Sequence, residues 1–141
     1  MNKKILKDVP NKYPFCIKTD CPVADHCLRP KAMEAITKRD RLVSIVNPCR
    51  TTGSEKCEYF RCDEPQRFGK GFMRMQEEML PRQYATFMDK LQRHFGRNAY
   101  FERRRGERLC TPDDVAYIRK VLESLNLQHL DFDEYEEHYV W

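Results

Sequence analysis

Cysteines are the residues of this 141-residue chain whose type and spacing most directly suggest chemistry. Six of the seven fall within residues 16–62, on a stretch that also holds many prolines and turn residues. Clustered thiols in a reducing compartment are typical of metal ligands or reactive groups, and structural disulfides are rare there. The odd number also argues against a closed disulfide framework. We therefore interpret this stretch as a metal-binding module, with free or redox-active thiols as the alternative.

Three of the thiols, Cys16, Cys21 and Cys27, share one irregular segment, and a fourth could come from Cys49, Cys57 or Cys62. Four thiolates around Zn²⁺ form a closed structural site, whose binding energy also stabilises the fold. The spacings are longer than those of common zinc fingers, and a 4Fe-4S cluster also takes four cysteines. Both cofactors therefore stay open. The seventh cysteine, Cys110, lies far along the chain, and we expect it to pack in the core.

An arginine-rich segment, residues 93–108, is the second candidate site and holds six arginines and two glutamates. Guanidinium groups suit phosphate oxygens, and the neighbouring Tyr100 and Phe101 could stack on bases. The segment therefore predicts contact with nucleic acid or a nucleoprotein complex. Ion pairs with glutamates on the segment, or with the acidic C-terminus, explain the same pattern equally well. The predicted phosphate contacts are Arg97, Arg103, Arg104, Arg105 and Arg108.

Charge is distributed unevenly along the chain, whose net charge is +4. Residues 1–108 carry 24 basic and 14 acidic side chains, whereas residues 109–141 carry 2 basic and 8 acidic ones. The basic part favours phosphate-rich partners. Residues 131–141 combine five acids with four aromatics. We expect this tail to fold back onto the core, and the alternative is a motif that binds a protein partner.

Helices and strands that would position these residues can be placed from local signals. A short helix is expected over residues 31–41 and a short strand over residues 42–46. Apolar residues at helical spacing follow Pro81 and end at Gly96. Thr111 caps a second such helix, with Asp114 completing a capping box and Asn126 ending it. Between these two helices, residues 98–110 are expected to form a β-hairpin with arginines at its tip.

These elements predict an α+β fold with three parts. Residues 1–70 form the irregular, cysteine-rich, metal-binding module. Residues 71–128 form a helix–β-hairpin–helix unit, which could adopt a winged-helix-like arrangement. Residues 129–141 form the acidic-aromatic tail packed on the core.

Several classes of protein are excluded by simpler features. No apolar run is long enough to span a membrane. Residues 1–8 are charged and lack the apolar core of a signal peptide, so we expect a cytoplasmic location. The sequence has no His-Glu-x-x-His motif, phosphate loop or dinucleotide fingerprint. We therefore expect a non-enzymatic protein, although a Cys–His nucleophile stays open.

Motifs are spread over residues 13–141: Cys21-Pro22, Cys27-Leu28-Arg29, Asn47-Pro48, Cys57-Glu58-Tyr59-Phe60, Phe95-Gly96-Arg97, Tyr100 with Arg103-Arg104-Arg105-Gly106-Glu107, and Phe132, Tyr135, Tyr139 and Trp141. Together they resemble an uncharacterised family of small cysteine-containing proteins from Bacteroides-type gut bacteria. The resemblance carries no assigned activity. It implies that the thiols belonging together are Cys16, Cys21, Cys27 and Cys57, and it implies an anaerobic cytoplasm in which an iron–sulfur cluster would survive.

Together the residues predict a zinc-stabilised cytoplasmic binding protein that contacts nucleic acid or a nucleoprotein complex and regulates gene expression. The alternatives are an iron–sulfur redox or sensor protein and a protein-interaction adaptor that uses the tail. The sequence does not distinguish DNA from RNA or from a protein partner. It also leaves the oligomeric state open.

Overall fold

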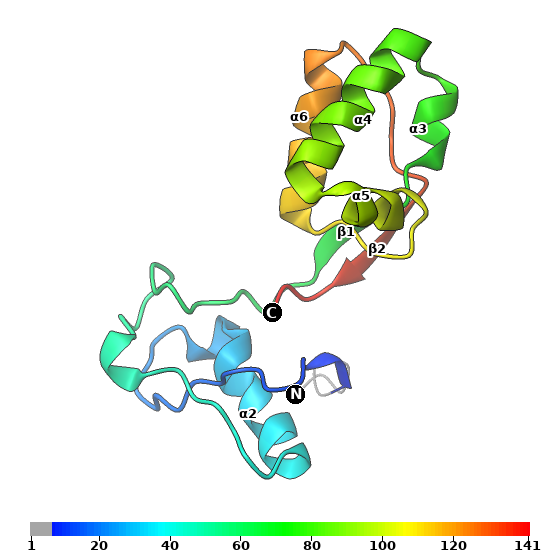
Figure 1. Ribbon diagram of the computed structural model, residues 1–141. Helices are drawn as coiled ribbons and strands as arrows, with labels where there is room; N and C mark the ends of the chain where they lie inside the picture. The colour runs from blue at the N-terminus through cyan, green and yellow to red at the C-terminus, as the bar shows by residue number, and fades with distance from the viewer. Residues whose placement is uncertain (1–6) are drawn as a thin grey trace. The chain divides into compact units, whose positions relative to one another are not determined.

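Two units make up the fold, which a computed structural model describes over residues 7–141 (Figure 1). The first unit extends to Pro65 and also includes Tyr139–Trp141, and the second is Gln66–His138. Helices and one pair of antiparallel strands confirm the predicted α+β class. Residues 1–6, part of the segment predicted not to be an export signal, lie outside the described residues. No helix within residues 7–141 is long and apolar enough to cross a membrane.

The first unit is built around helix α2 (Leu28–Arg39), with short 3-10 turns η1 (Ala24–His26) and η2 (Pro48–Arg50). Leu28, Ala32 and Ile36 recur every four residues, so they lie on one face of α2, and all three are fully buried. Two small clusters cover this face. One contains Val9, Tyr13 and Phe15, and the other contains Tyr139 and Trp141. The helix begins three residues before the predicted start, and Pro30 sits in its first turn.

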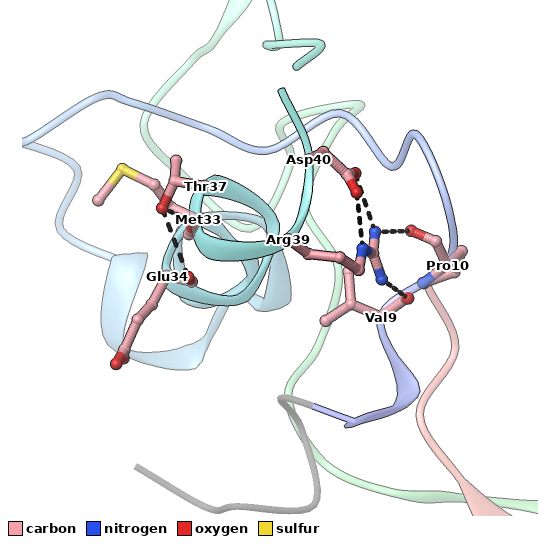
Figure 2. A network of polar contacts seen from close by, with 7 residues as sticks. All are labelled: Val9, Pro10, Met33, Glu34, Thr37, Arg39 and Asp40. Atoms are coloured by element: carbon pink, nitrogen blue, oxygen red, sulfur yellow. Dashed lines mark hydrogen bonds and ion pairs between the residues drawn. The ribbon is translucent and has the colours of Figure 1, made fainter. Parts of the chain in front are cut away.

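Arg39, the last residue of α2, fastens the N-terminal segment to the helix (Figure 2). Its guanidinium donates to the carbonyls of Val9, at 2.8 Å, and Pro10, at 3.1 Å. The same group pairs with the carboxylate of Asp40 through two hydrogen bonds. The pairing holds the guanidinium in one orientation, which aims its remaining donors at the two carbonyls.

Most of the remaining first unit is irregular. The predicted strand over residues 42–46 is wrong, because only Ile45 forms a bridge, in parallel with Phe15. Leu42 is 90% exposed. A β-strand needs a neighbouring strand along its whole length. This segment pairs with the chain at Phe15 alone, through two hydrogen bonds: the N–H of Phe15 donates to the carbonyl of Ser44, and the N–H of Val46 donates to the carbonyl of Phe15. The apolar pattern of the segment therefore has no sheet to join.

The second unit combines strand β1 (Gln66–Lys70), which pairs antiparallel with β2 (Glu134–His138), and four helices. These are α3 (Met73–Glu77), α4 (Pro81–Phe95), α5 (Arg97–Arg104) and α6 (Pro112–Ser124). Phe72 stands at the centre of one continuous core, with aromatic rings of Phe87, Tyr100 and Phe132 around it. Cys110 is fully buried in the same core, as predicted, and burial raises the pKa of its thiol to about 12.

Helices α4 and α6 confirm the predictions made from local signals. Gly96 ends α4 with a φ of 90°, a value that favours glycine. Thr111 accepts a hydrogen bond from the backbone N–H of Asp114, and the Asp114 carboxylate accepts one from the N–H of Thr111. This reciprocal capping box starts α6. Asn126 follows the helix end with a φ of 57°.

The predicted β-hairpin over residues 98–110 is wrong, because most of this segment is helix α5. Arginine, alanine and glutamate are good helix formers, and they outnumber Tyr100 and Phe101, the two strand formers. Tyr100 is fully buried against Phe72, a contact made from one face of a helix. Gly106 does supply a turn, with a φ of 76°, but it follows α5 rather than joining two strands. A winged-helix-like unit with a hairpin wing is therefore not formed.

The acidic-aromatic tail is shared between the units. Phe132 is buried in the core of the second unit, and Tyr139 is buried in the first. The tail acids bind nearby partners: Asp133 accepts from the backbone N–H groups of Met73 and Arg74. Because two of its aromatic rings are buried, the tail offers a protein partner less apolar surface than its sequence suggests.

Candidate metal centre

One small cavity in the first unit is lined by all four cysteines of the set implied by the family resemblance. Cys16, Cys21 and Cys27 come from the segment that precedes α2, and Cys57 comes from the loop after η2. The cavity has a volume of about 30 Å³, and its walls are almost entirely apolar. Cys49 and Cys62 are exposed and do not line it. Among the three thiols considered for the fourth position, Cys57 is therefore the one that shares the cavity.

Tight turns carry the chain from Cys21 to Cys27. The N–H of Ala24 donates to the carbonyl of Cys21 at 3.2 Å, and the N–H of Cys27 donates to the carbonyl of Ala24 at 3.3 Å. Pro22 favours such a turn because its ring presets φ. The two turns meet at η1, so both cysteines face the same cavity although five residues separate them.

Backbone pairing brings the other segments to this loop. The N–H of Cys16 donates to the carbonyl of Arg29 at 3.4 Å, which places Cys16 beside the start of α2. The N–H of Leu28 donates to the carbonyl of Arg61 at 2.7 Å, and the N–H of Asp63 donates to the carbonyl of His26 at 3.1 Å. These bonds align residues 26–28 with residues 61–63, next to the loop that carries Cys57.

Cys57 has the most distinctive environment of the four. It lies between two turns, its own N–H donating to Ser54 and its carbonyl accepting from the N–H of Phe60, both at 3.0 Å. Burial raises the pKa of its thiol, but hydrogen bonds from the backbone of Thr52, Tyr59 and Phe60 and from the Thr52 hydroxyl outweigh that effect. The net pKa is lowered. Since the thiolate is the form that ligates metals, these donors favour a ligand at this position.

Arg29 places a positive charge at the wall of the cavity. It is buried, and its guanidinium donates to the carbonyls of Tyr59, at 2.6 Å, and Pro14, at 2.8 Å. It also lies over the ring of Tyr13, 4.9 Å from the centroid. Four thiolates around a divalent cation leave a net negative charge, which a buried guanidinium would offset. The sequence places Arg29 in the motif Cys27-Leu28-Arg29 but assigns it no role, because residue type does not separate a buried arginine from an exposed one.

The four sulfurs are not assembled around one point. Over residues 7–141, no three His, Cys, Asp or Glu side chains lie close enough together to hold a metal ion. The donor set nevertheless fits a thiophilic ion in number and chemistry. Ligation would require side-chain rotations and a closer approach of the loop segments, and metal sites commonly form together with the fold around them. Metal binding by these residues stays a prediction.

The arginines of the second candidate site are mostly engaged inside the second unit. Arg103 pairs with Asp114 at 3.2 Å and lies over the ring of Phe95. Arg105 donates two hydrogen bonds to Glu107, at 2.8 and 2.9 Å. Arg108 lies 3.6 Å from Glu102. These acids belong to the segment itself or to α6, so the pairs use none of the tail carboxylates.

The other two predicted phosphate contacts differ from each other. Arg97 is exposed at the start of α5 and makes no ion pair within the described part of the chain. Arg104 is half-buried, and its Nε atom is buried without a hydrogen-bond acceptor. Its guanidinium lies 5.9 Å from the ring centroid of Phe101. The structure therefore leaves Arg97, Arg105 and Arg108 exposed, and it uses Arg103 for internal contacts.

Comparison with known proteins identifies a family without identifying an activity. No curated protein and no solved structure matches the chain. A family model matches residues 1–141. The chain therefore belongs to DUF6078, a family of unknown function.

Proposed function

We propose that the first unit is a structural zinc centre, in which Cys16, Cys21, Cys27 and Cys57 hold one Zn²⁺ ion. The observation that carries the proposal is that these four thiols line a single cavity. The lowered pKa of Cys57 and the buried charge of Arg29 support it, because both favour bound thiolates. On this proposal the protein is a metal-stabilised binding protein rather than an enzyme.

The size of the cavity favours a single ion over a cluster. A volume of about 30 Å³ leaves room for roughly two water molecules. A 4Fe-4S cluster has eight atoms and would require the loops to move apart. Zinc requires the opposite movement, because its thiolate ligands lie at about 2.3 Å. Contraction of four sulfurs onto one ion fits a small, apolar cavity better than expansion does.

A structural metal also fits the energetics of the unit. Its two small clusters bury few large side chains, and much of its chain is irregular. Small units with poor cores commonly need a metal or disulfides. Structural zinc supplies an apparent binding free energy of about 10–16 kcal/mol at neutral pH, which would serve this unit as folding free energy.

The test is metal content by elemental analysis of protein purified without oxygen, together with a visible spectrum. We expect one zinc per chain in the wild type and in Cys49→Ser, whose exposed thiol is outside the cavity. We expect less than about a tenth of that in Cys57→Ser. Iron with sulfide and a brown chromophore would establish the cluster instead. Protein without metal, or a Cys57→Ser variant with full zinc, would overturn the proposed site.

Nucleic acid is the second part of the proposed function, and the exposed arginines near α5 are the observation that favours it. The ion pairs of Arg105 with Glu107 and of Arg108 with Glu102 are solvent-exposed and therefore weak, so phosphate groups could displace the glutamates. We propose Arg97, Arg105 and Arg108 as the contacts. Arg103 is better explained by its pair with Asp114, which is largely buried.

Fluorescence anisotropy with single- and double-stranded oligonucleotides at several salt concentrations tests this part. Replacing Arg97, Arg105 and Arg108 by alanine should weaken binding, and the salt slope should fall by about one for each arginine–phosphate pair that is removed. Arg93→Ala, at an exposed arginine of α4 paired with Asp89, is the matched control. If the wild type binds no nucleic acid at low salt, the phosphate-contact role is wrong.

Three finer predictions complete the proposal. The cytoplasm is the proposed location, and a Bacteroides-type anaerobic bacterium is the proposed source. Regulation of gene expression is the proposed role of the nucleic-acid contact. Fractionation of native cells, with the metal content of each fraction, checks the first of these.

A further inference from the structure

Cys27 and Cys62 face each other across an isolated antiparallel bridge in the first unit. The two hydrogen bonds of the bridge lie on either side of the pair, from Leu28 N–H to Arg61 and from Asp63 N–H to His26. Neither cysteine uses its own backbone N–H or C=O in the bridge. They therefore form a non-hydrogen-bonded pair, and the ion pair between Lys31 and Asp63 helps to hold this register.

A non-hydrogen-bonded antiparallel pair has the geometry that a disulfide needs. Opposite Cα atoms in such pairs lie about 4.5 Å apart, with side chains on the same face of the two strands. Disulfides form across Cα separations of about 4.4–6.8 Å. The backbone can therefore accept a bond between these two sulfurs with little rearrangement.

We propose that Cys27 and Cys62 form a reversible disulfide, and that its formation removes Cys27 from the metal centre. The second half rests on the proposed zinc site, whereas the first half stands on the bridge alone. Cys62 is exposed and can meet an oxidant, and Cys27 is buried and lies at the wall of the cavity. The sulfur of Cys27 can therefore serve either as a metal ligand or as a disulfide partner of Cys62, but not as both at once.

The reaction is a thiol–disulfide exchange with a small disulfide such as oxidised glutathione. The Cys62 thiolate attacks one sulfur of the oxidant, forms a mixed disulfide and expels one thiolate. The Cys27 thiolate then attacks the Cys62 sulfur and expels the second. The two cysteine protons end on the two released thiols, and the oxidant takes up two electrons. If Cys27 is bound to zinc it carries no proton, so the second leaving thiolate takes its proton from water, and the metal loses one of its four ligands.

Reducing compartments keep structural disulfides rare, but transient redox-sensing ones do occur there. The exposed thiol of Cys62 opposite the buried thiol of Cys27 is suited to such redox sensing. Cys49 is a matched comparison, because it is exposed like Cys62 but forms no bridge to another cysteine within residues 7–141. Oxidation of the two should therefore have different outcomes.

The experiment treats full-length protein with oxidised glutathione and maps its peptides by non-reducing mass spectrometry. In the wild type and in Cys49→Ser we expect a Cys27–Cys62 crosslink in most molecules, reversed by dithiothreitol. In Cys62→Ser we expect no such crosslink. If Cys62 keeps glutathione as a stable mixed disulfide, or if Cys27 bonds elsewhere, the proposed pair is wrong.

Zinc release, followed with a chromogenic chelator in the same reaction, tests the coupling. Release should track the crosslink in the wild type and should slow at least several-fold in Cys62→Ser. A crosslink that forms while zinc stays bound would overturn the coupling, because Cys27 would then not be a required zinc ligand. A crosslink in protein that never contained metal would overturn the zinc site and leave the disulfide intact.

Discussion

The two units of this chain reach their folds by different physical means. The second unit surrounds Phe72 with aromatic and aliphatic side chains from its four helices and the tail. Over residues 7–65 and 139–141, the first unit has one helix of three turns, two small clusters and long irregular loops. Hydrophobic burial is the main stabilising contribution in the second unit. The first unit adds polar links made by Arg29 and Arg39, and we propose that a metal held by the four thiols of its cavity completes it.

Metal removal should produce the largest difference between the units. Trp141, the single tryptophan, belongs to the first unit and packs edge-on against Tyr13, at 5.3 Å between ring centroids. Its fluorescence therefore reports on that unit, while far-UV circular dichroism reports mostly on the helices of the second. Because structural zinc contributes about 10–16 kcal/mol, a chelator should abolish the native Trp141 signal at 25 °C. Most of the helical signal should remain.

A chelator that leaves both signals unchanged would contradict this difference. In that case the first unit would hold itself together without metal. Magnesium at the same concentration as the chelator is the control for general ionic effects.

Phe72→Ala should cost the second unit about 3–5 kcal/mol, because it removes the ring at the centre of a close-packed core. Denaturant unfolding followed by circular dichroism measures this loss. The Trp141 transition should move much less. Equal shifts of both transitions would show that the units unfold as one, which would remove the basis of the comparison.

Thr111→Ala tests a smaller and purely local contribution to the second unit. The variant loses the hydroxyl that accepts from the N–H of Asp114, and an N-cap of this kind contributes about 1 kcal/mol. Thr86→Ala on the exposed face of α4 is the matched control, with an expected change below about 0.5 kcal/mol. Denaturation midpoints compared side by side should rank the two variants in this order.

Thiol reactivity compares the units without changing their stability. Only the thiolate reacts with iodoacetamide. At pH 7 a thiol with a pKa of about 12 is ionised in roughly one molecule in 10⁵, so Cys110 in the second unit should stay unmodified until the protein unfolds. The hydrogen bonds that lower the pKa of Cys57 exist only in the folded first unit, so its alkylation should persist to lower pH than that of an ordinary cysteine in metal-free protein that keeps this fold, and not in protein that has lost it.

Peptide mass spectrometry after short exposures between pH 6 and 9 measures both rates. Cys49, which is exposed, is the internal reference. Faster reaction at Cys110 than at Cys57 would reverse the assignment of one cysteine to a buried core and the other to a ligand-like environment.

Local signals predicted the parts of the fold whose causes are local. The apolar stripe before Gly96 and the capping box at Thr111 specify α4 and α6, because each depends on residues within four positions. Burial of Cys110 was also predicted. The predictions of a hairpin over residues 98–110 and of a strand over residues 42–46 failed, because strand formation is not a local property. A strand exists only where a distant partner pairs with it, and β1 takes as its partner a tail segment more than sixty residues away.

The candidate site divides in the same way. Sequence alone determined which residue types could bind a metal, and the family resemblance selected four of the seven cysteines. Only tertiary structure brought Cys57 to the cavity of Cys16, Cys21 and Cys27, buried Arg29 in its wall and set Cys62 opposite Cys27. The reason is that the sequence gives the type of each residue directly. The proximity of these side chains and their burial arise only when hydrogen bonds join segments about thirty residues apart.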